Sequence, residues 1–147
     1  MEITILQQNI VWSDPEANRK KADEAISRNP GSDLYVLPEM FSTGFCTQPE
    51  GIAESTDSET LAWMKRKAAE TNAAIAGSVA VTKDGKYYNR FYFVKPDGSV
   101  AQYDKKHLFT YGGEHLQFTP GNERVIVEWK GVRILLEVCY DLRFPVW

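Results

Sequence analysis

The sequence has few of the residues that build metal centres and disulfide frameworks. Its 147 residues include two histidines and two cysteines, and Cys46 and Cys139 are too far apart for a C-x-x-C pair. This set is too small for a zinc site made of the usual ligands. The spacing of the cysteines still permits a disulfide. Because nothing else points to a secreted scaffold, we expect free thiols in a reducing cytoplasm.

Long apolar runs and basic stretches are missing as well. The first nine residues alternate in polarity and carry Glu2, which is typical of a strand and not of a signal peptide. No apolar run reaches the length of a membrane span. The formal net charge is −3, so no basic stripe is available to displace counterions from a nucleic acid. We therefore expect neither a membrane nor a nucleic acid as partner.

The composition that remains is that of a globular protein, with 43% hydrophobic and 25% charged residues. We expect one domain over residues 1–147. Apolar periodicity predicts two helices, which begin near 13–16 and 56–59 where Ser/Thr-x-x-Glu patterns fit capping boxes. Either Ser13 or Asp14 can cap the first helix. It predicts strands near 3–8, 33–37, 73–81, 88–94, 100–104, 124–129 and 132–138. Hairpin turns are expected at 83–86 and 130–131, and an irregular loop at 110–121. This order indicates an α/β fold in which two helices cover one face of a sheet.

Four polar residues lie at the ends of predicted strands or in the loops beyond them: Glu39, Lys105, Glu114 and Cys139. Sites in α/β sheets gather at the carboxyl ends of strands, so these residues are compatible with one cleft. A thiol attacks as a thiolate, a carboxylate can take its proton, and a lysine can stabilise an oxyanion. Each residue alone also has a structural explanation, Cys139 as a core cysteine and the others as surface charges. The residues by themselves leave both interpretations open.

Three segments resemble the signatures of the nitrilase, or carbon–nitrogen hydrolase, superfamily. They are Leu-Pro-Glu-Met-Phe at 37–41, Tyr-Asp-Lys-Lys-His-Leu-Phe at 103–109 and Cys-Tyr-Asp-Leu-Arg-Phe-Pro at 139–145. The resemblance implies that Glu39 is the general base and Cys139 the nucleophile. The family pattern Lys-x-His-Leu-Phe makes Lys105 the catalytic lysine.

The resemblance also assigns supporting roles. Glu114 matches a second glutamate that many members use to orient the lysine or the substrate. The backbone N–H of Tyr140 would share the oxyanion with Lys105, and neither a metal nor a cofactor is required. Asp141 and Arg143 would support the turn that carries the nucleophile.

Within the superfamily the segments are most similar to bacterial omega-amidases, which hydrolyse the terminal amide of 2-oxo acids such as 2-oxoglutaramate. The alternatives are an N-carbamoyl amino acid amidohydrolase, an aliphatic amidase, or an inactive nitrilase-like interaction fragment. A papain-like thiol hydrolase is disfavoured, because no histidine lies apart from the lysine and Glu114 segments. Candidates for the pocket wall, with ordinary loop packing as the equal alternative, are Phe41, Phe45, Tyr111 and Phe118.

The resemblance implies an α-β-β-α sandwich, of which these residues match the N-terminal half or so of a typical member. We therefore expect a truncated domain that lacks part of the pocket wall and of the dimer interface usual in the family. Our hypothesis is that the chain alone is inactive or weakly active and prone to self-association, because uncovered apolar faces favour association.

Overall fold

The computed structural model describes all 147 residues and contains a mixed main sheet with the strand order β1-β2-β4-β5-β6. These strands are β1 (Ile3–Ile5), β2 (Leu34–Val36), β4 (Ala74–Lys83), β5 (Lys86–Val94) and β6 (Val100–Asp104). A two-residue strand, β3 (Glu54–Ser55), pairs with the far end of β4. β1, β2 and β4 are parallel, whereas β5 runs antiparallel to both β4 and β6. β2 and β6 therefore point the same way and end at the same edge of the sheet.

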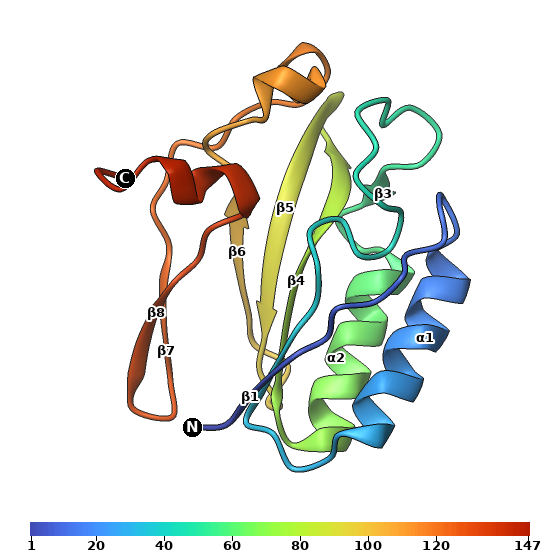
Figure 1. Ribbon diagram of the computed structural model, residues 1–147, viewed down its shortest axis with the longest axis vertical. Coiled ribbons are helices and arrows are strands. Elements are labelled where there is room, and N and C mark those ends of the chain that lie inside the picture. The colour runs from blue at the N-terminus through green and yellow to red at the C-terminus, as the bar shows by residue number, and fades with distance from the viewer.

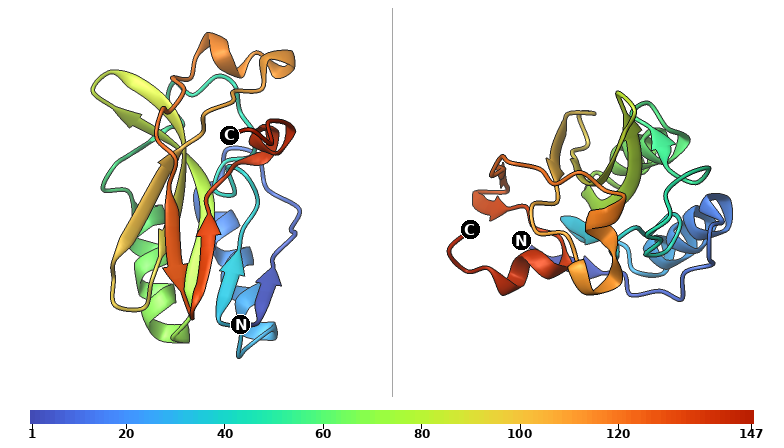
Figure 2. Two further views of the ribbon diagram at one scale, coloured as in Figure 1. Left: turned by 90° about the vertical axis from the view of Figure 1, so that its left-hand side faces the viewer. Right: turned by 90° about the horizontal axis from the view of Figure 1, so that it is seen from above.

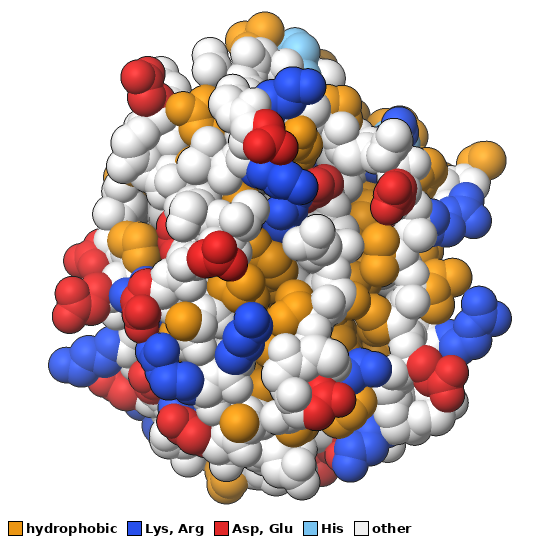
Figure 3. Space-filling view, turned by 180° about the vertical axis from the view of Figure 1, so that it is seen from behind, with side chains coloured by type: hydrophobic (Ala, Val, Ile, Leu, Met, Phe, Trp, Pro, Cys, Tyr) orange, Lys and Arg blue, Asp and Glu red, His pale blue; other side chains and the backbone are white.

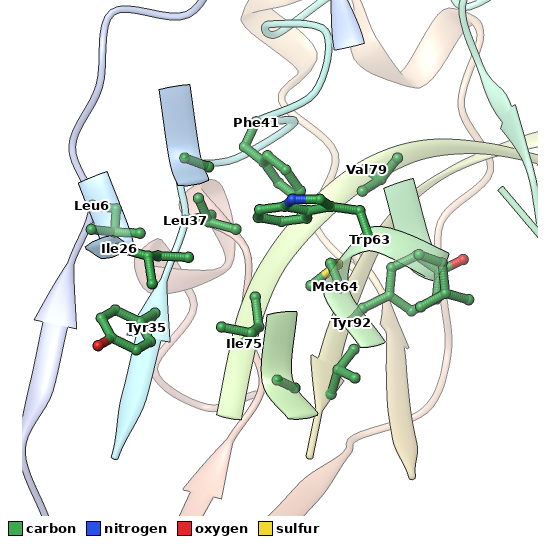
Figure 4. Packing of buried hydrophobic residues seen from close by; sticks show 14 of the residues in the cluster. Leu6, Ile26, Tyr35, Leu37, Phe41, Trp63, Met64, Ile75, Val79 and Tyr92 are labelled. Carbon is green, nitrogen blue, oxygen red and sulfur yellow. The ribbon is translucent and has the colours of Figure 1, made fainter. Parts of the chain in front are cut away.

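Two helices, α1 (Pro15–Arg28) and α2 (Glu59–Thr71), cover one face of this sheet (Figure 1). Their apolar positions pack with the sheet into a core of sixteen buried residues. Figure 4 shows the centre of this core, where the Trp63 ring lies 5.8 Å from the Phe41 ring. The prediction of two helices on one sheet face is confirmed.

The other face of the sheet is covered by a β-hairpin of β7 (Ile126–Trp129) and β8 (Val132–Leu135), seen in front of the sheet in Figure 2, left. A second core fills the space between them, with Phe93 and Tyr103 from the sheet and Val127 from the hairpin. The Trp129 indole also donates a hydrogen bond to the Asp33 carbonyl at 2.8 Å. The molecule thus has three layers, one of helices and two of strands.

The turns of both long hairpins agree with the sequence prediction. The Asp84-Gly85 and Lys130-Gly131 pairs have positive φ at both positions, which is the geometry of a type I′ turn. Neither predicted capping box forms, but Asp14, one of the two predicted caps of the first helix, is confirmed. The carboxylate of Asp14 caps α1, and the hydroxyl of Ser58 caps α2 by accepting from the Leu61 N–H at 3.2 Å.

Several segments differ from the predicted boundaries. β1 ends at Ile5 and β8 at Leu135, each three residues earlier than expected, because the chain leaves the ladder there. The short β3 was not predicted. The loops predicted as irregular contain the single 3-10 turns Thr110–Gly112 and Glu114–Leu116, and Cys139–Arg143 forms a third. These turns depend on tertiary contacts described below.

Charged groups of both signs are interspersed around the face seen in Figure 3, with apolar side chains between them. No region of that face gathers basic groups alone. Neither helix has the length and apolar character needed to cross a membrane.

Candidate active site

Glu39 lies on a segment that crosses β4 at very close range. A Cβ on Gly77 would lie 2.8 Å from the Leu37 Cβ, so glycine is needed for this approach. The Ser78 hydroxyl accepts from the Met40 N–H at 2.9 Å, and Met40 has a φ of 45°. The backbone around Glu39 is therefore held in a left-handed conformation that L-residues seldom adopt.

Lys105 follows directly after β6, at the edge of the sheet where β2 also ends. Its N–H donates to the Asn89 carbonyl and its carbonyl accepts from the Gly121 N–H, both at 3.0 Å. A Cβ on Gly121 would lie 2.1 Å from the Asp104 carbonyl oxygen, so no other residue fits that close approach. Both flanking contacts fix the direction in which the lysine side chain leaves the strand.

The Lys105 ammonium bridges two carboxylates. Its Nζ donates to Glu39 Oε1 at 2.7 Å and to Glu114 Oε2 at 2.9 Å. Lys105 and Glu114 are completely buried, whereas the Glu39 side chain is 18% exposed. Burial alone would lower the pKa of Lys105, but the two carboxylates outweigh it and raise the pKa above its ordinary value. The lysine is therefore a fixed cation between the two glutamates.

Glu114 is positioned by its own loop. It begins the turn Glu114–Leu116 after Gly113, whose φ is 75°. Its Oε2 also accepts from the Phe109 N–H at 2.6 Å. The buried carboxylate thus orders the loop that the sequence left irregular.

Cys139 begins the last 3-10 turn with a φ of 46° and is exposed. Left-handed backbone at a non-glycine residue costs of order 1–3 kcal/mol and is common at active sites. Partial burial and the charge of Glu39 raise the pKa of the Cys139 thiol, although Lys105 opposes this. The resting sulfur is therefore protonated at neutral pH, with an ionisable carboxylate near it.

Glu39 and Cys139 both line a cavity of about 570 Å³. Its other walls are formed by Phe45, Phe109, Tyr140, Leu142 and Arg143. Lys105 and Glu114 are not among the lining residues and lie behind them. The structure thus brings the four predicted site residues together, with two on the cavity surface and two beneath it.

Of the four aromatic candidates for the pocket wall, only Phe45 lines this cavity. Phe41 and Phe118 belong to buried cores, and Tyr111 is 92% exposed. Phe41 and Phe118 thus follow the alternative of ordinary packing, and Tyr111 is neither buried nor part of the cavity wall. Phe109, which does line the cavity, lies inside the lysine segment and was not predicted.

Asp141 supports the turn that begins at Cys139, as predicted. Its buried carboxylate accepts from the Val138 N–H at 3.0 Å, the Tyr103 hydroxyl at 2.8 Å and the His107 N–H at 2.9 Å. Arg143 does not support the turn. Its side chain is exposed, makes no hydrogen bond or ion pair, and borders the cavity instead.

Sequence reasoning missed Asn89, which lies fully buried in β5 and donates hydrogen bonds to both Glu39 and Glu114. The only available signal was a strongly polar amide in the interior of a predicted strand.

Comparisons with known proteins agree with this architecture. The model of the carbon-nitrogen hydrolase family matches residues 2–146. The chain is 49% identical over 147 residues to Omega-amidase YafV of Escherichia coli strain K12, covering 100% of this chain and 57% of that protein. It is 36% identical over 149 residues to the 2-oxoglutaramate amidase of Bacillus subtilis strain 168, covering 99% of this chain and 58% of that protein.

A solved structure shows the same fold. XC1258 from Xanthomonas campestris, described as a CN-hydrolase superfamily protein with an arsenic adduct in the active site, superposes with a TM-score of 0.95 at 44% identity. The match covers 99% of this chain and 55% of that one. The chain therefore belongs to the carbon–nitrogen hydrolase family, and it spans a little over half the length of these relatives.

Proposed function

We propose that this chain carries the catalytic residues of an amidase that hydrolyses the terminal amide of small 2-oxo acids. The observation that carries the proposal is the Lys105 bridge between Glu39 and Glu114, placed directly behind a cavity into which Cys139 opens. This arrangement provides a nucleophile, a base and a fixed cation at one place.

In the proposed reaction Glu39 accepts the thiol proton as the Cys139 sulfur attacks the amide carbonyl. The tetrahedral oxyanion binds the Tyr140 N–H and Lys105. Glu39 then returns the proton to the departing nitrogen, the C–N bond breaks and ammonia leaves a thioester on Cys139. Water, activated by Glu39, attacks the thioester, releases the acid and restores the thiol.

Access to Lys105 is part of this proposal. Two of its three ammonium protons are used by the glutamates, and its Nζ lies 5.5 Å from the centre of the Phe45 ring. Because the lysine is completely buried, contact with an oxyanion requires a displacement of a neighbouring side chain. Glu39 and Phe45 both adjoin Lys105 and line the cavity. Because Glu39 holds the ammonium by a hydrogen bond, we assign this movement to Phe45.

The substrate class is supported by the two amidase relatives and by the charge of the cavity. Arg143 is the one cationic side chain among the lining residues and has no carboxylate partner in the chain. A 2-oxo acid amide carries a carboxylate that this guanidinium can bind. Arg143→Gln should therefore raise the KM for 2-oxoglutaramate at least about tenfold. The KM for a neutral aliphatic amide should stay the same, and an equal change for both amides would contradict this role.

Ammonia release from 2-oxoglutaramate, glutamine and N-carbamoyl amino acids tests the proposal. Cys139→Ala and Glu39→Gln should reduce kcat by at least about 10³-fold, whereas Cys46→Ala should retain activity because Cys46 is buried outside the cavity lining. Where turnover is slow, intact mass after an acid quench detects the acylated Cys139. Full activity in Cys139→Ala or Glu39→Gln would refute the site, and a preference for carbamoyl substrates would refute the substrate class.

A further inference from the structure

Asn89 occupies the space between the two glutamates of the candidate site. Its Nδ2 donates to Glu39 Oε1 at 2.8 Å and to Glu114 Oε1 at 2.9 Å, and its side chain is completely buried. Ionised carboxylates only accept hydrogen bonds, so the NH₂ end of the Asn89 amide must face the two glutamates. The main-chain carbonyl of Asn89 also accepts from the Lys105 N–H. One residue thus contacts Glu39, Glu114 and Lys105.

These contacts divide the two oxygens of Glu39. Oε1 accepts from both Lys105 and Asn89, whereas Oε2 has no hydrogen-bond donor in the chain. Glu39 lines the cavity and is partly exposed, so Oε2 is the oxygen that remains for a proton or a water molecule.

The charge balance explains why an uncharged donor is useful here. Two carboxylates and one ammonium leave a net negative charge in a largely buried site. Neighbouring like charges favour protonation of one carboxylate, whereas hydrogen bonds to the ionised form oppose it. The amide of Asn89 supplies two such hydrogen bonds and carries no charge. A second cation in its place would make Glu39 a weaker base.

The oxygen of the Asn89 side-chain amide indicates that the side chain is not placed for stability alone. Asn89 Oδ1 is buried and has no hydrogen-bond partner. An unpaired buried acceptor is destabilising, and it is found where another requirement prevails. By contrast, the equally buried Asn18 uses both ends of its amide, donating to the Val11 and Ser42 carbonyls and accepting from the Val11 N–H.

We propose that Asn89 is a positioning residue whose two hydrogen bonds favour the ionised form of both glutamates of the site and leave Oε2 of Glu39 as the proton acceptor. The role in catalysis rests on the proposed function, but the effect on the glutamates does not require a substrate.

The experiment is an NMR pH titration of the chain with ¹³C-labelled glutamate carboxyl groups, assigned with Glu39→Gln and Glu114→Gln. In Asn89→Leu, the titration midpoint of at least one of the two carboxyls should rise by about one pH unit or more. Asn18→Leu removes a buried asparagine with backbone partners only, so it should destabilise the fold without moving these midpoints. Unchanged midpoints in folded Asn89→Leu would overturn the proposal.

The unsubstituted protein gives a second measurement that does not depend on folding of a variant. The Nδ2 protons of Asn89 should exchange slowly and change chemical shift with the protonation of the two glutamates, whereas those of Asn18 should not titrate. An Asn89 side-chain amide whose chemical shift does not change over the pH range in which the two glutamates titrate would refute the proposal.

Where turnover is measurable, Asn89→Leu should lower kcat with little change in KM, and activity should recover as the pH rises. If the original chain shows no turnover but the glutamate midpoints shift in Asn89→Leu as expected, the result counts against the proposed function and not against the role of Asn89.

Discussion

Asp141 organises the residues around Cys139. Its two carboxylate oxygens accept four hydrogen bonds, two of them from the backbone and side chain of His107. These contacts connect the end of β6 with the turn that begins at Cys139. The left-handed backbone of Cys139 is maintained because the following turn is anchored in this way.

Replacement of Asp141 by asparagine should therefore be costly. The new NH₂ group would face donors, leaving at least one buried N–H or O–H unpaired, and we expect a loss of about 2–3 kcal/mol in the free energy of unfolding. Urea unfolding measures the loss. Glu128→Gln, an exposed change without hydrogen-bond partners, is the control and should stay within about 0.5 kcal/mol. Equal stability of the two variants would contradict the anchoring role.

Tyr103 makes the free energy of unfolding depend on pH in the alkaline range. Burial and the hydrogen bond to Asp141 raise the pKa of its hydroxyl well above the ordinary value. The pKa of tyrosine in the unfolded chain is about 10. Because the folded-state pKa is higher, the stability that Tyr103 contributes is complete below about pH 10 and is lost as the pH rises above it. Tyr103→Phe should be less stable at pH 7 by about 1–3 kcal/mol, because Asp141 loses a donor. It should also lose less stability between pH 9 and 11 than the original protein, as followed by urea midpoints. A parallel decline in both proteins would refute the assignment.

At the scale of elements, the helix starts show how local patterns compete. Thr56 and Ser58 both precede α2, and Thr56 has the spacing of a capping box with Glu59. The helix begins at Glu59, which places Ser58 at the N-cap position with its hydroxyl on the Leu61 N–H. Thr56 and Asp57 form a turn between β3 and the helix, so Thr56 lies too far before the first helical turn to cap it.

Ser58→Ala should lower the free energy of unfolding by about 1 kcal/mol, because the Leu61 N–H loses its acceptor. Thr56→Ala is the matched control, since its hydroxyl makes no hydrogen bond, and should change stability by less than about 0.5 kcal/mol. Thermal unfolding distinguishes the two variants. A larger loss for Thr56→Ala would restore the capping box.

At the scale of the whole molecule, the helices bury one face of the main sheet and the hairpin covers the other, but the outer face of the hairpin is open. Ile126 and Leu135 pair across β7 and β8 and are 48% and 39% exposed. Adjacent apolar side chains of this kind favour association in water.

We expect the chain to self-associate through this hairpin. The double variant Ile126→Lys/Leu135→Glu should shift the sedimentation profile towards the monomer, because it places charges on the open face. Val146→Lys changes an isolated side chain that is 94% exposed and should leave association unchanged. A monomeric original chain at the same concentration would refute this expectation.

Much of the layout was predictable because the relevant forces are local. The apolar periodicity of α1 and α2, the buried strand at β2 and the two type I′ turns follow from neighbouring residues. The boundaries of β1 and β8 were not predictable, because partners on other strands decide where a ladder ends. Asn89 escaped prediction for a similar reason, since its two carboxylate partners are 25 and 50 residues away.

The sequence by itself determined the family, since the three segments around Glu39, Lys105 and Cys139 carry its signatures and the family match covers residues 2–146. It also determined the order of helices and strands, except for the short β3. Only the tertiary structure decided that Lys105 and Glu114 are buried behind the cavity, that Arg143 borders it and that Asn89 joins the two glutamates. Burial and hydrogen bonding depend on which distant segments meet, and that is set by the packing of the sheet against its two covering layers.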